Sequence, residues 1–136
     1  IQCAKLTGQI NARRTYARHY KDHLAGIPGL AFIDAPEGSS YSHIAARVHD
    51  RQHVMKAALK HGVQLGEVIE YSVPEMAAYR RYRREKAQWP VAQTLSRQTI
   101  NLPVSGRFDE SVAAKVVTVM RQVLKDAPPP SALPTA

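Results

Sequence analysis

Two residues of this chain combine a functional side chain with a position where binding sites commonly form. His43 lies in a predicted strand, and its imidazole can donate and accept hydrogen bonds near neutral pH, which suits hydroxyl or phosphate groups. Tyr71 ends another predicted strand just before a proline turn, and such turns often carry functional residues. We predict that both bind substrate. The alternative for each is structural: a half-buried histidine bonded to backbone, and a packing tyrosine whose hydroxyl is satisfied.

The six histidines also raise the question of a metal site. His19 and His23 are four residues apart on a predicted helix, a spacing that places two ligands on one face. The sequence places no third ligand beside them, and no glutamate stands in a His-Glu-x-x-His arrangement. We therefore expect no metal ion.

The densest basic run, Tyr79–Lys86, holds five cations in eight residues and interleaves them with tyrosines. Such a run could bind phosphate or nucleic acid. On a helix, however, Arg80 and Arg84 share one face while Arg81 points elsewhere, which favours a solvated helix whose tyrosines pack inward. The net charge of +8 allows the same two interpretations, an anionic partner or an ordinary solvated surface. No nucleic-acid motif accompanies it, which argues against that partner.

Other patterns exclude several classes of protein. Ser39-Ser40 lacks the Gly-x-Ser-x-Gly turn of a hydrolase, and the glycines form no phosphate-cradling loop. Cys3 is the only cysteine, so it cannot form an internal disulfide, and this fits a reducing, cytoplasmic compartment. No apolar run approaches the roughly 18 residues of a membrane span. Residues 1–14 lack the pattern of a signal peptide.

Apolar periodicity predicts a long amphipathic helix over residues 1–25, ended by Gly26. The stripe is interrupted by Arg13 and consists of Leu6, Ile10, Ala17, Tyr20 and Leu24. Since the first residue is Ile rather than Met and already belongs to this helix, we expect the chain to begin inside a helix of a longer protein.

Further elements are predicted from alternation, caps and turn residues. The expected strands lie at 30–33, 41–49, 67–71 and 99–102, and the expected helices at 51–61, 75–85, 90–98 and 109–125. This order indicates an α/β chain of the α+β type, with a small antiparallel or mixed sheet of three to four strands packed by helices. Residues 126–136 hold four prolines and no apolar periodicity, so we predict a disordered Pro-rich tail.

Several short motifs follow one another in order: Ser42-His43-Ile44, Tyr71-Ser72-Val73-Pro74 and Leu102-Pro103. They resemble the His-Leu-Phe strand, the Tyr-x-x-Pro turn and the closing Leu-Pro of the DegT/DnrJ/EryC1/StrS family, the pyridoxal-phosphate sugar aminotransferases. Ile1–Leu6 is similar to the helix after the family's Gly-x-Asn-x-Arg motif, and Arg13-Arg14 and Tyr20 to the helix that follows. Met76 and Ser105 depart from the family's usual histidines or methionine, so no substrate contact is carried over there.

The resemblance implies that residues 1–125 are the C-terminal small domain of a fold type I aminotransferase. The large domain, with the lysine that binds pyridoxal phosphate, would lie upstream, so this chain would hold no catalytic or cofactor-binding residue. The implied reaction transfers an amino group from an amino acid to a nucleotide-linked keto-sugar for polysaccharide biosynthesis, in a cytoplasmic homodimer. His43 and Tyr71 would bind that substrate. Alone, the chain would be inactive.

Two other interpretations remain open. The chain could be a non-catalytic binding or regulatory module that uses its basic surface for an anionic partner. It could also be a plain structural α+β domain.

Overall fold

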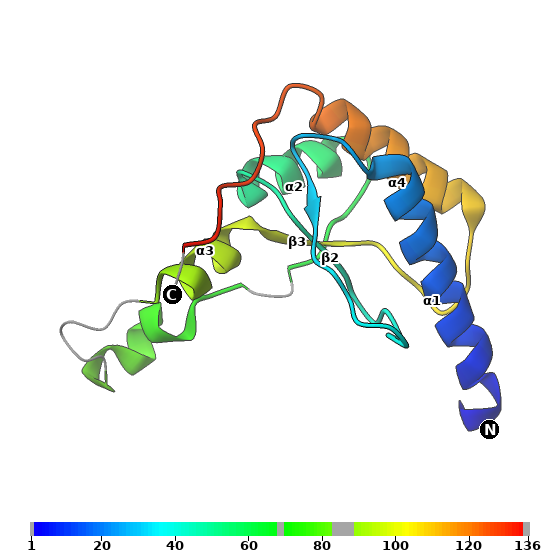
Figure 1. Cartoon of the computed structure of the whole chain (residues 1–136), viewed down its shortest axis with the longest axis horizontal. Coiled ribbons are helices and arrows are strands. Elements are labelled where there is room, and N and C mark those ends of the chain that lie inside the picture. The colour runs from blue at the N-terminus through cyan, green and yellow to red at the C-terminus, as the bar shows by residue number, and fades with distance from the viewer. Residues whose placement is uncertain (1, 68–69, 83–88, 135–136) are drawn as a thin grey trace.

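The computed structural model describes residues 2–67, 70–82 and 89–134, although not the side chains of residues 2 and 80. Two consecutive strands follow the first helix, and the third strand lies between the last two helices (Figure 1). In order the elements are α1 (Gln2–Leu24), β1 (Ala31–Phe32), β2 (Ile44–Arg47), α2 (Arg51–Lys60), the 3₁₀ helices η1 (Val73–Glu75) and η2 (Ala77–Tyr82), α3 (Pro90–Gln98), β3 (Thr99–Leu102) and α4 (Glu110–Val123). The mixed α/β class predicted from the sequence is confirmed.

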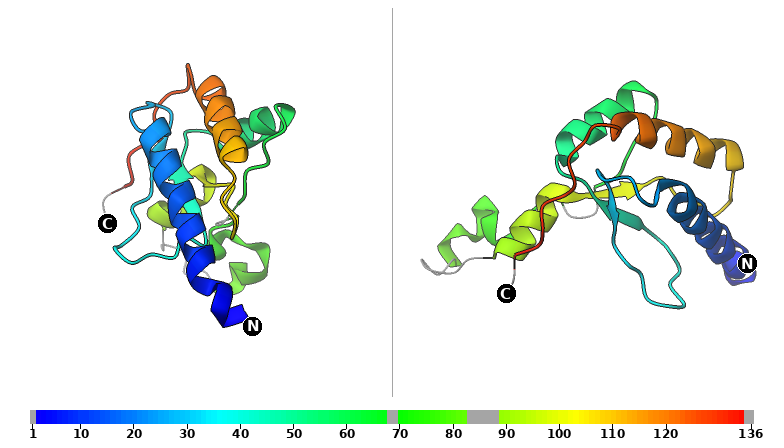
Figure 2. Two further views of the ribbon diagram at one scale, coloured as in Figure 1. Left: turned by 90° about the vertical axis from the view of Figure 1, so that its right-hand side faces the viewer. Right: turned by 45° about the horizontal axis from the view of Figure 1, so that its top comes forward.

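The three strands form an antiparallel sheet in the order β1-β2-β3. In β2, Ile44 and Ala46 are buried while the alternating residues are half-buried, because successive side chains of a strand point to opposite faces. The buried face packs on α1, α2 and α4, which lie together on one side of the sheet (Figure 2). The 3₁₀ helices and α3 extend away from this body as an arm (Figure 1).

The stripe predicted on α1 is only half correct. Tyr20 and Leu24 are fully buried, but Leu6 is 49% exposed. The reason is length: α1 has 23 residues and its neighbour α4 only 14, so α4 covers the second half of α1. The first half projects beyond the body (Figure 2).

Helix boundaries follow the predicted caps. Asp50 and Asp109 each accept a backbone N–H three residues ahead with the side-chain carboxylate, at 3.0 and 3.2 Å, and so begin α2 and α4. After α2, the N–H of Gly62 donates to Leu59 O at 2.9 Å and that of Val63 to Ala58 O at 3.0 Å. This is the Schellman arrangement, which requires the left-handed φ of +74° that Gly62 adopts.

The strands predicted at 30–33 and 41–49 form, but over shorter stretches. The loop between them turns back along α1, where the Arg14 guanidinium donates to Gly38 O at 2.9 Å and Ser39 O at 3.0 Å. Tyr41 has a positive φ of 48°, a conformation incompatible with extended backbone, so the second strand cannot begin before it.

The strand predicted at 67–71 is wrong for the residues that can be seen there. Only Gly66 bridges to the sheet, with hydrogen bonds of 2.9 and 2.8 Å to Asn101, while residues 67, 70 and 71 are irregular and 68–69 lie outside the described residues. Arg51 on α2 competes with pairing to β3 here, because its guanidinium lies 3.9 Å from the Glu67 carboxylate and donates to the Glu70 carbonyl oxygen, an acceptor that a strand would use in its ladder.

The helix predicted at 75–85 is replaced by η1 and η2 up to Tyr82, and residues 83–88 lie outside the described part of the chain. Hydrogen bonds between residues three apart, such as Glu75 N–H to Ser72 O at 2.8 Å and Tyr79 N–H to Met76 O at 3.0 Å, tighten the backbone into 3₁₀ turns. After α4, residues 126–134 have no regular secondary structure, and their disorder in solution stays a prediction.

Candidate functional site

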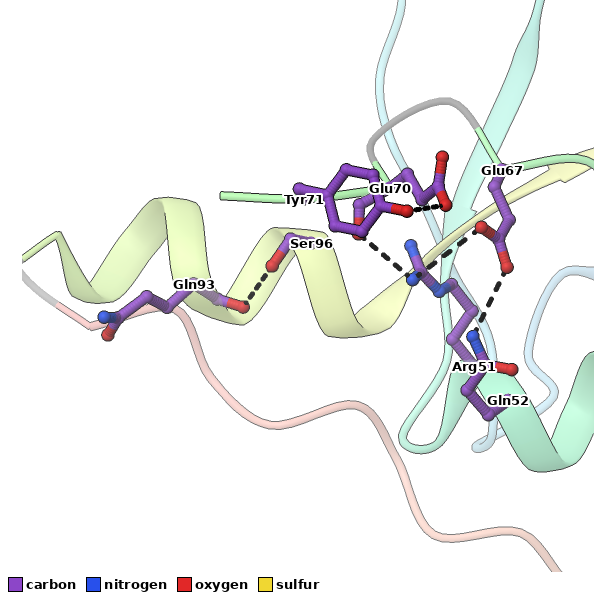
Figure 3. Close-up of polar contacts among 7 residues, drawn as sticks. All are labelled: Arg51, Gln52, Glu67, Glu70, Tyr71, Gln93 and Ser96. Carbon is purple, nitrogen blue, oxygen red and sulfur yellow. Dashed lines mark hydrogen bonds and ion pairs between the residues drawn. The ribbon is translucent and has the colours of Figure 1, made fainter. Parts of the chain in front are cut away.

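A pocket at the junction of body and arm gathers polar side chains from three segments. Its volume is about 210 Å³. The first turn of α2, the segment that runs from residue 70 through η1 to its C-cap, and the end of α3 contribute its lining residues Arg51, Glu70, Tyr71, Ser72, Glu75, Met76, Ser96 and Arg97. We call it the Tyr71 pocket; Figure 3 shows the polar contacts around it.

Arg51 positions the Tyr71 side of the pocket. It follows the N-cap Asp50 directly, so the start of α2 fixes its place. Its guanidinium is buried and lies 3.9 Å from the Glu67 carboxylate, and it donates to the Glu70 carbonyl oxygen at 3.3 Å (Figure 3). Gln52 also donates to the Glu67 carboxylate, at 3.3 Å. Two neighbouring helix residues therefore hold the segment that carries Tyr71.

Tyr71 offers an exposed ring and a protonated hydroxyl. The side chain is 57% exposed, and its hydroxyl donates to the Glu70 carboxylate. That hydrogen bond, and the negative charge of Glu70, raise the pKa of Tyr71 above its ordinary value. The phenol consequently remains a neutral donor at physiological pH and cannot act as a base there. Its exposed face can support the apolar side of a sugar ring.

Serines line the floor of the pocket. Ser96 donates to Gln93 O at 2.9 Å. Ser72 is buried, and its Oγ meets no hydrogen-bond partner within the described ranges. Because a buried hydroxyl without a partner costs about 1–3 kcal/mol, the Ser72 Oγ is suited to a polar group of a bound molecule.

The opposite wall carries a second ion pair. Arg97 lies 3.7 Å from the Glu75 carboxylate, which also accepts a hydrogen bond from the Gln93 side chain at 3.1 Å. Each arginine is thus balanced by a glutamate, and Glu70 adds a further negative charge. The balance fits neutral hydroxyl groups better than a phosphate, since acceptors and donors alternate without excess positive charge.

The pocket has the features of a binding site rather than a catalytic one. Among the residues that the structure describes, its lining contains no lysine, cysteine or histidine, and neither of its serines is paired with a base. Pyridoxal phosphate needs a lysine for its covalent attachment, which none of the described lining residues supplies, so the Tyr71 pocket does not fit that cofactor.

His43 lies apart from the Tyr71 pocket. It is exposed in the loop before β2, and its Nδ1 lies 3.2 Å from the Ser42 hydroxyl. The structure therefore does not bring His43 into the pocket with Tyr71, and its substrate contact stays a prediction.

The expectation of inward-facing tyrosines in the basic run is wrong. Tyr79 and Tyr82 are 47% and 68% exposed, and the Arg81 guanidinium lies 4.8 Å from the centre of the Tyr82 ring. A 3₁₀ turn advances 120° per residue, so residues that an α-helix would bury face outward here. With Trp89 the two tyrosines line a shallow apolar hollow of about 200 Å³.

His19 and His23 stack with ring centres 4.3 Å apart. Over the described ranges, no three histidine, cysteine or acidic side chains come together as metal ligands. No helix in those ranges is long and apolar enough to cross a membrane.

Sequence reasoning found Tyr71 but missed Arg51, Glu75 and Arg97. Arg51 could have been noticed from the sequence, because it directly follows the predicted N-cap Asp50 and therefore begins a helix. Glu75 and Arg97 are far apart in the sequence, and only the arm brings them together.

Solved structures with a similar fold include sugar aminotransferases, among them CalS13 of Micromonospora echinospora. DesV of S. venezuelae, in complex with a ketimine intermediate, has a TM-score of 0.79 and 21% identity; the match covers 87% of this chain and 32% of DesV. DesI, in the presence of its TDP-sugar product, has a TM-score of 0.76 and 19% identity, over 86% and 31% of the two chains. The fold is that of one part of an aminotransferase subunit.

Sequence comparison reaches the same class. The erythromycin biosynthesis sensory transduction protein EryC1 of Saccharopolyspora erythraea is 28% identical over 116 residues, and the UDP-N-acetyl-3-dehydro-alpha-D-glucosamine 3-aminotransferase of Acidithiobacillus ferrooxidans is 27% identical over 117. These matches cover 82% and 84% of this chain but only 31% of each relative. The chain belongs to the DegT/DnrJ/EryC1/StrS aminotransferase family, whose sequence pattern matches residues 1–121.

Proposed function

We propose that residues 1–125 are the C-terminal small domain of a pyridoxal-phosphate-dependent aminotransferase. The whole enzyme would transfer an amino group from an amino acid donor to a nucleotide-linked keto-sugar. Membership of the family over residues 1–121 carries the proposal. The names of two similar proteins support the substrate class, since one acts on a UDP-linked dehydro-glucosamine and the other was crystallised with a TDP-sugar product.

This chain's own contribution would be to bind and orient the sugar. The Tyr71 pocket supports this role because it combines an exposed ring, arginine–glutamate ion pairs and a buried hydroxyl that has no hydrogen-bond partner among the described residues. The Tyr71 ring would contact one face of the sugar, while Glu75, Arg97 and the Ser72 Oγ would hydrogen-bond its hydroxyls.

The remaining parts of the enzyme would come from outside this chain. Pyridoxal phosphate, when bound to the upstream domain, supplies an electron sink for amino transfer. The small domain would cover that site, exclude water and help to form a homodimer in the cytoplasm.

The test uses the complete encoded polypeptide. Purified protein should bind pyridoxal phosphate and transfer nitrogen from glutamate to a UDP- or TDP-linked keto-sugar. Tyr71→Ala, which removes the ring, and Glu75→Gln should raise KM for the sugar about tenfold with little change in cofactor binding. Tyr82→Ala, at an exposed tyrosine outside the pocket, should behave as wild type. A polypeptide that fails to bind the cofactor would exclude the proposal.

A second candidate rests on the exposed Tyr79, Arg81 and Tyr82 together with the net charge of +8. A non-catalytic module would bind an anionic partner through this surface, and that binding would weaken steeply with salt. Absence of the cofactor together with salt-sensitive binding of a polyanion would favour this candidate.

A further inference from the structure

Residues 126–134 take a defined path although they form no helix or strand. They leave the end of α4, pass the start of α2 and finish beside α3, as both views show (Figures 1 and 2). They follow the region matched by the family, which ends at residue 121. Pro128, Pro129, Pro130 and Pro134 restrict the backbone, so holding this segment in one extended path costs less conformational entropy than for other residues.

The first attachment of this segment is a close approach between Ala127 and Gly29. A Cβ on Gly29 would lie 2.9 Å from the Ala127 Cβ, 3.3 Å from the Ala127 carbonyl oxygen and 3.4 Å from the Leu124 Cβ. The Ala127 N–H also donates to Leu124 O at 3.2 Å, and its side chain packs partly buried against the core. The absence of a side chain at Gly29 is what lets the segment lie flat here.

The second attachment is the Arg47 guanidinium. Its Nη2 donates to the Ser131 carbonyl oxygen. The same guanidinium donates through Nε and Nη2 to the Gln98 side-chain oxygen, at 3.2 and 2.9 Å. Gln98 is the buried last residue of α3, and its backbone carbonyl accepts from Val48 N–H at 2.9 Å. Arg47 therefore joins β2, the end of α3 and the segment after α4.

We propose that residues 126–134, instead of the disordered tail predicted from their sequence, are a strap that fixes the arm to the body and thereby sets the shape of the Tyr71 pocket. Ser96 and Arg97 line that pocket from α3, two residues and one residue before Gln98. A strap that holds Gln98 through Arg47 also holds these two pocket residues. Its release lets α3 move relative to Arg51 and Tyr71. The inference does not depend on the chemistry assigned to the whole enzyme.

The experiment measures amide hydrogen exchange of residues 91–98 in the complete encoded protein. Gly29→Ala places a methyl group where Ala127 lies and should accelerate exchange in α3 by about tenfold, with little change in α4. The double variant Gly29→Ala/Ala127→Gly removes the closest of the clashing atoms and should restore slow exchange. Gly8→Ala is the matched control, because a Cβ there meets nothing within 4 Å.

A second variant separates the strap from simple loss of stability. Deletion of residues 128–134 removes the strap but leaves the Arg47–Gln98 contact in place, and it should accelerate α3 exchange as Gly29→Ala does. Unchanged α3 exchange in both variants would overturn the proposal. Equal acceleration in α1, α4 and α3 would overturn it as well, because it would indicate global destabilisation rather than release of the arm.

Discussion

The Tyr20 hydroxyl donates to the Pro103 carbonyl oxygen at 2.8 Å, across 83 residues of sequence. Tyr20 is fully buried on α1, and Pro103 directly follows β3. The bond therefore ties the long first helix to the end of the central sheet. Both residues belong to motifs that carry the family resemblance, and this hydrogen bond gives each of them a role in holding the fold together.

Tyr20→Phe should destabilise the protein by about 1 kcal/mol. The substitution keeps the ring but leaves the Pro103 carbonyl oxygen without its donor. Urea unfolding, followed by circular dichroism, measures the loss. Tyr82→Phe provides the control, because Tyr82 is 68% exposed and its hydroxyl should contribute little. Equal stability of the two variants would show that the Tyr20 bond adds nothing.

The same pair predicts a dependence on alkaline pH. Burial raises the pKa of Tyr20, and the neighbouring Tyr16 raises it further. The folded protein therefore holds this proton more tightly than the unfolded chain, whose tyrosines titrate near pH ~10. The stabilisation is complete below that pH and is lost as pH rises toward the folded pKa. The stability difference between wild type and Tyr20→Phe should accordingly shrink as the pH rises above roughly 10.

Gly62→Ala should destabilise the protein by about 1 kcal/mol, because the left-handed φ of +74° strains any residue with a Cβ. The nearest atom to an added Cβ is the flexible end of Lys115, at 3.0 Å, so backbone strain rather than collision is the cause. Thermal unfolding measures the loss. Gly62→Asn should cost less than Gly62→Ala, because asparagine tolerates this conformation. The reverse order would contradict the strain argument.

The sequence predicts the elements that are governed by local signals. Asp50, Asp109 and Gly62 fix helix ends through contacts within a few residues, and α3 and β3 form at the predicted residues 90–98 and 99–102. The order of short motifs also led to the correct family, because a family pattern combines many positions that are individually weak.

The predictions from the sequence fail where a residue distant along the chain determines the local structure. The segment after Gly66 has the composition of a strand, but Arg51 on α2 competes with its pairing to β3. Leu6 continues an apolar stripe that α4 is too short to cover. In the site, Tyr71 could be predicted from the proline turn that follows it. The pairing of Glu75 with Arg97 could not, because it depends on the placement of the whole arm.

Glu70→Gln should lower the pKa of Tyr71 toward the ordinary tyrosine value. The main cause of the raised pKa is the hydrogen bond to the Glu70 carboxylate, and an amide accepts that bond more weakly and carries no charge. Spectrophotometric titration measures phenolate formation, and subtraction of the Tyr71→Phe curve isolates this residue. Glu110→Gln, on the first turn of α4, should leave the curve unchanged. If Glu70→Gln left the pKa of Tyr71 unchanged, the hydrogen bond between Tyr71 and Glu70 would not persist in solution.

Arg51→Met should destabilise the protein by about 2 kcal/mol and free the Tyr71 segment. The substitution fills similar space but removes the donor to the Glu70 carbonyl and the cation beside Glu67, and leaves both acceptors next to a buried apolar side chain. Urea unfolding gives the loss of stability. Hydrogen exchange at residues 70–72 gives the local effect, which should exceed the change in α1.

Two control variants, one at Arg51 itself and one at the next residue, test whether the effect of Arg51→Met comes from its contact with the Glu70 carbonyl. Gln52→Ala removes one exposed hydrogen bond to the same Glu67 carboxylate and should cost less than about 0.5 kcal/mol. Arg51→Lys keeps the charge near Glu67 without the planar donor fork and should fall between wild type and Arg51→Met. If Gln52→Ala loosened residues 70–72 as much as Arg51→Met, the segment would be held by Glu67 alone. The carbonyl contact of Arg51 would then have no separate role in positioning Tyr71.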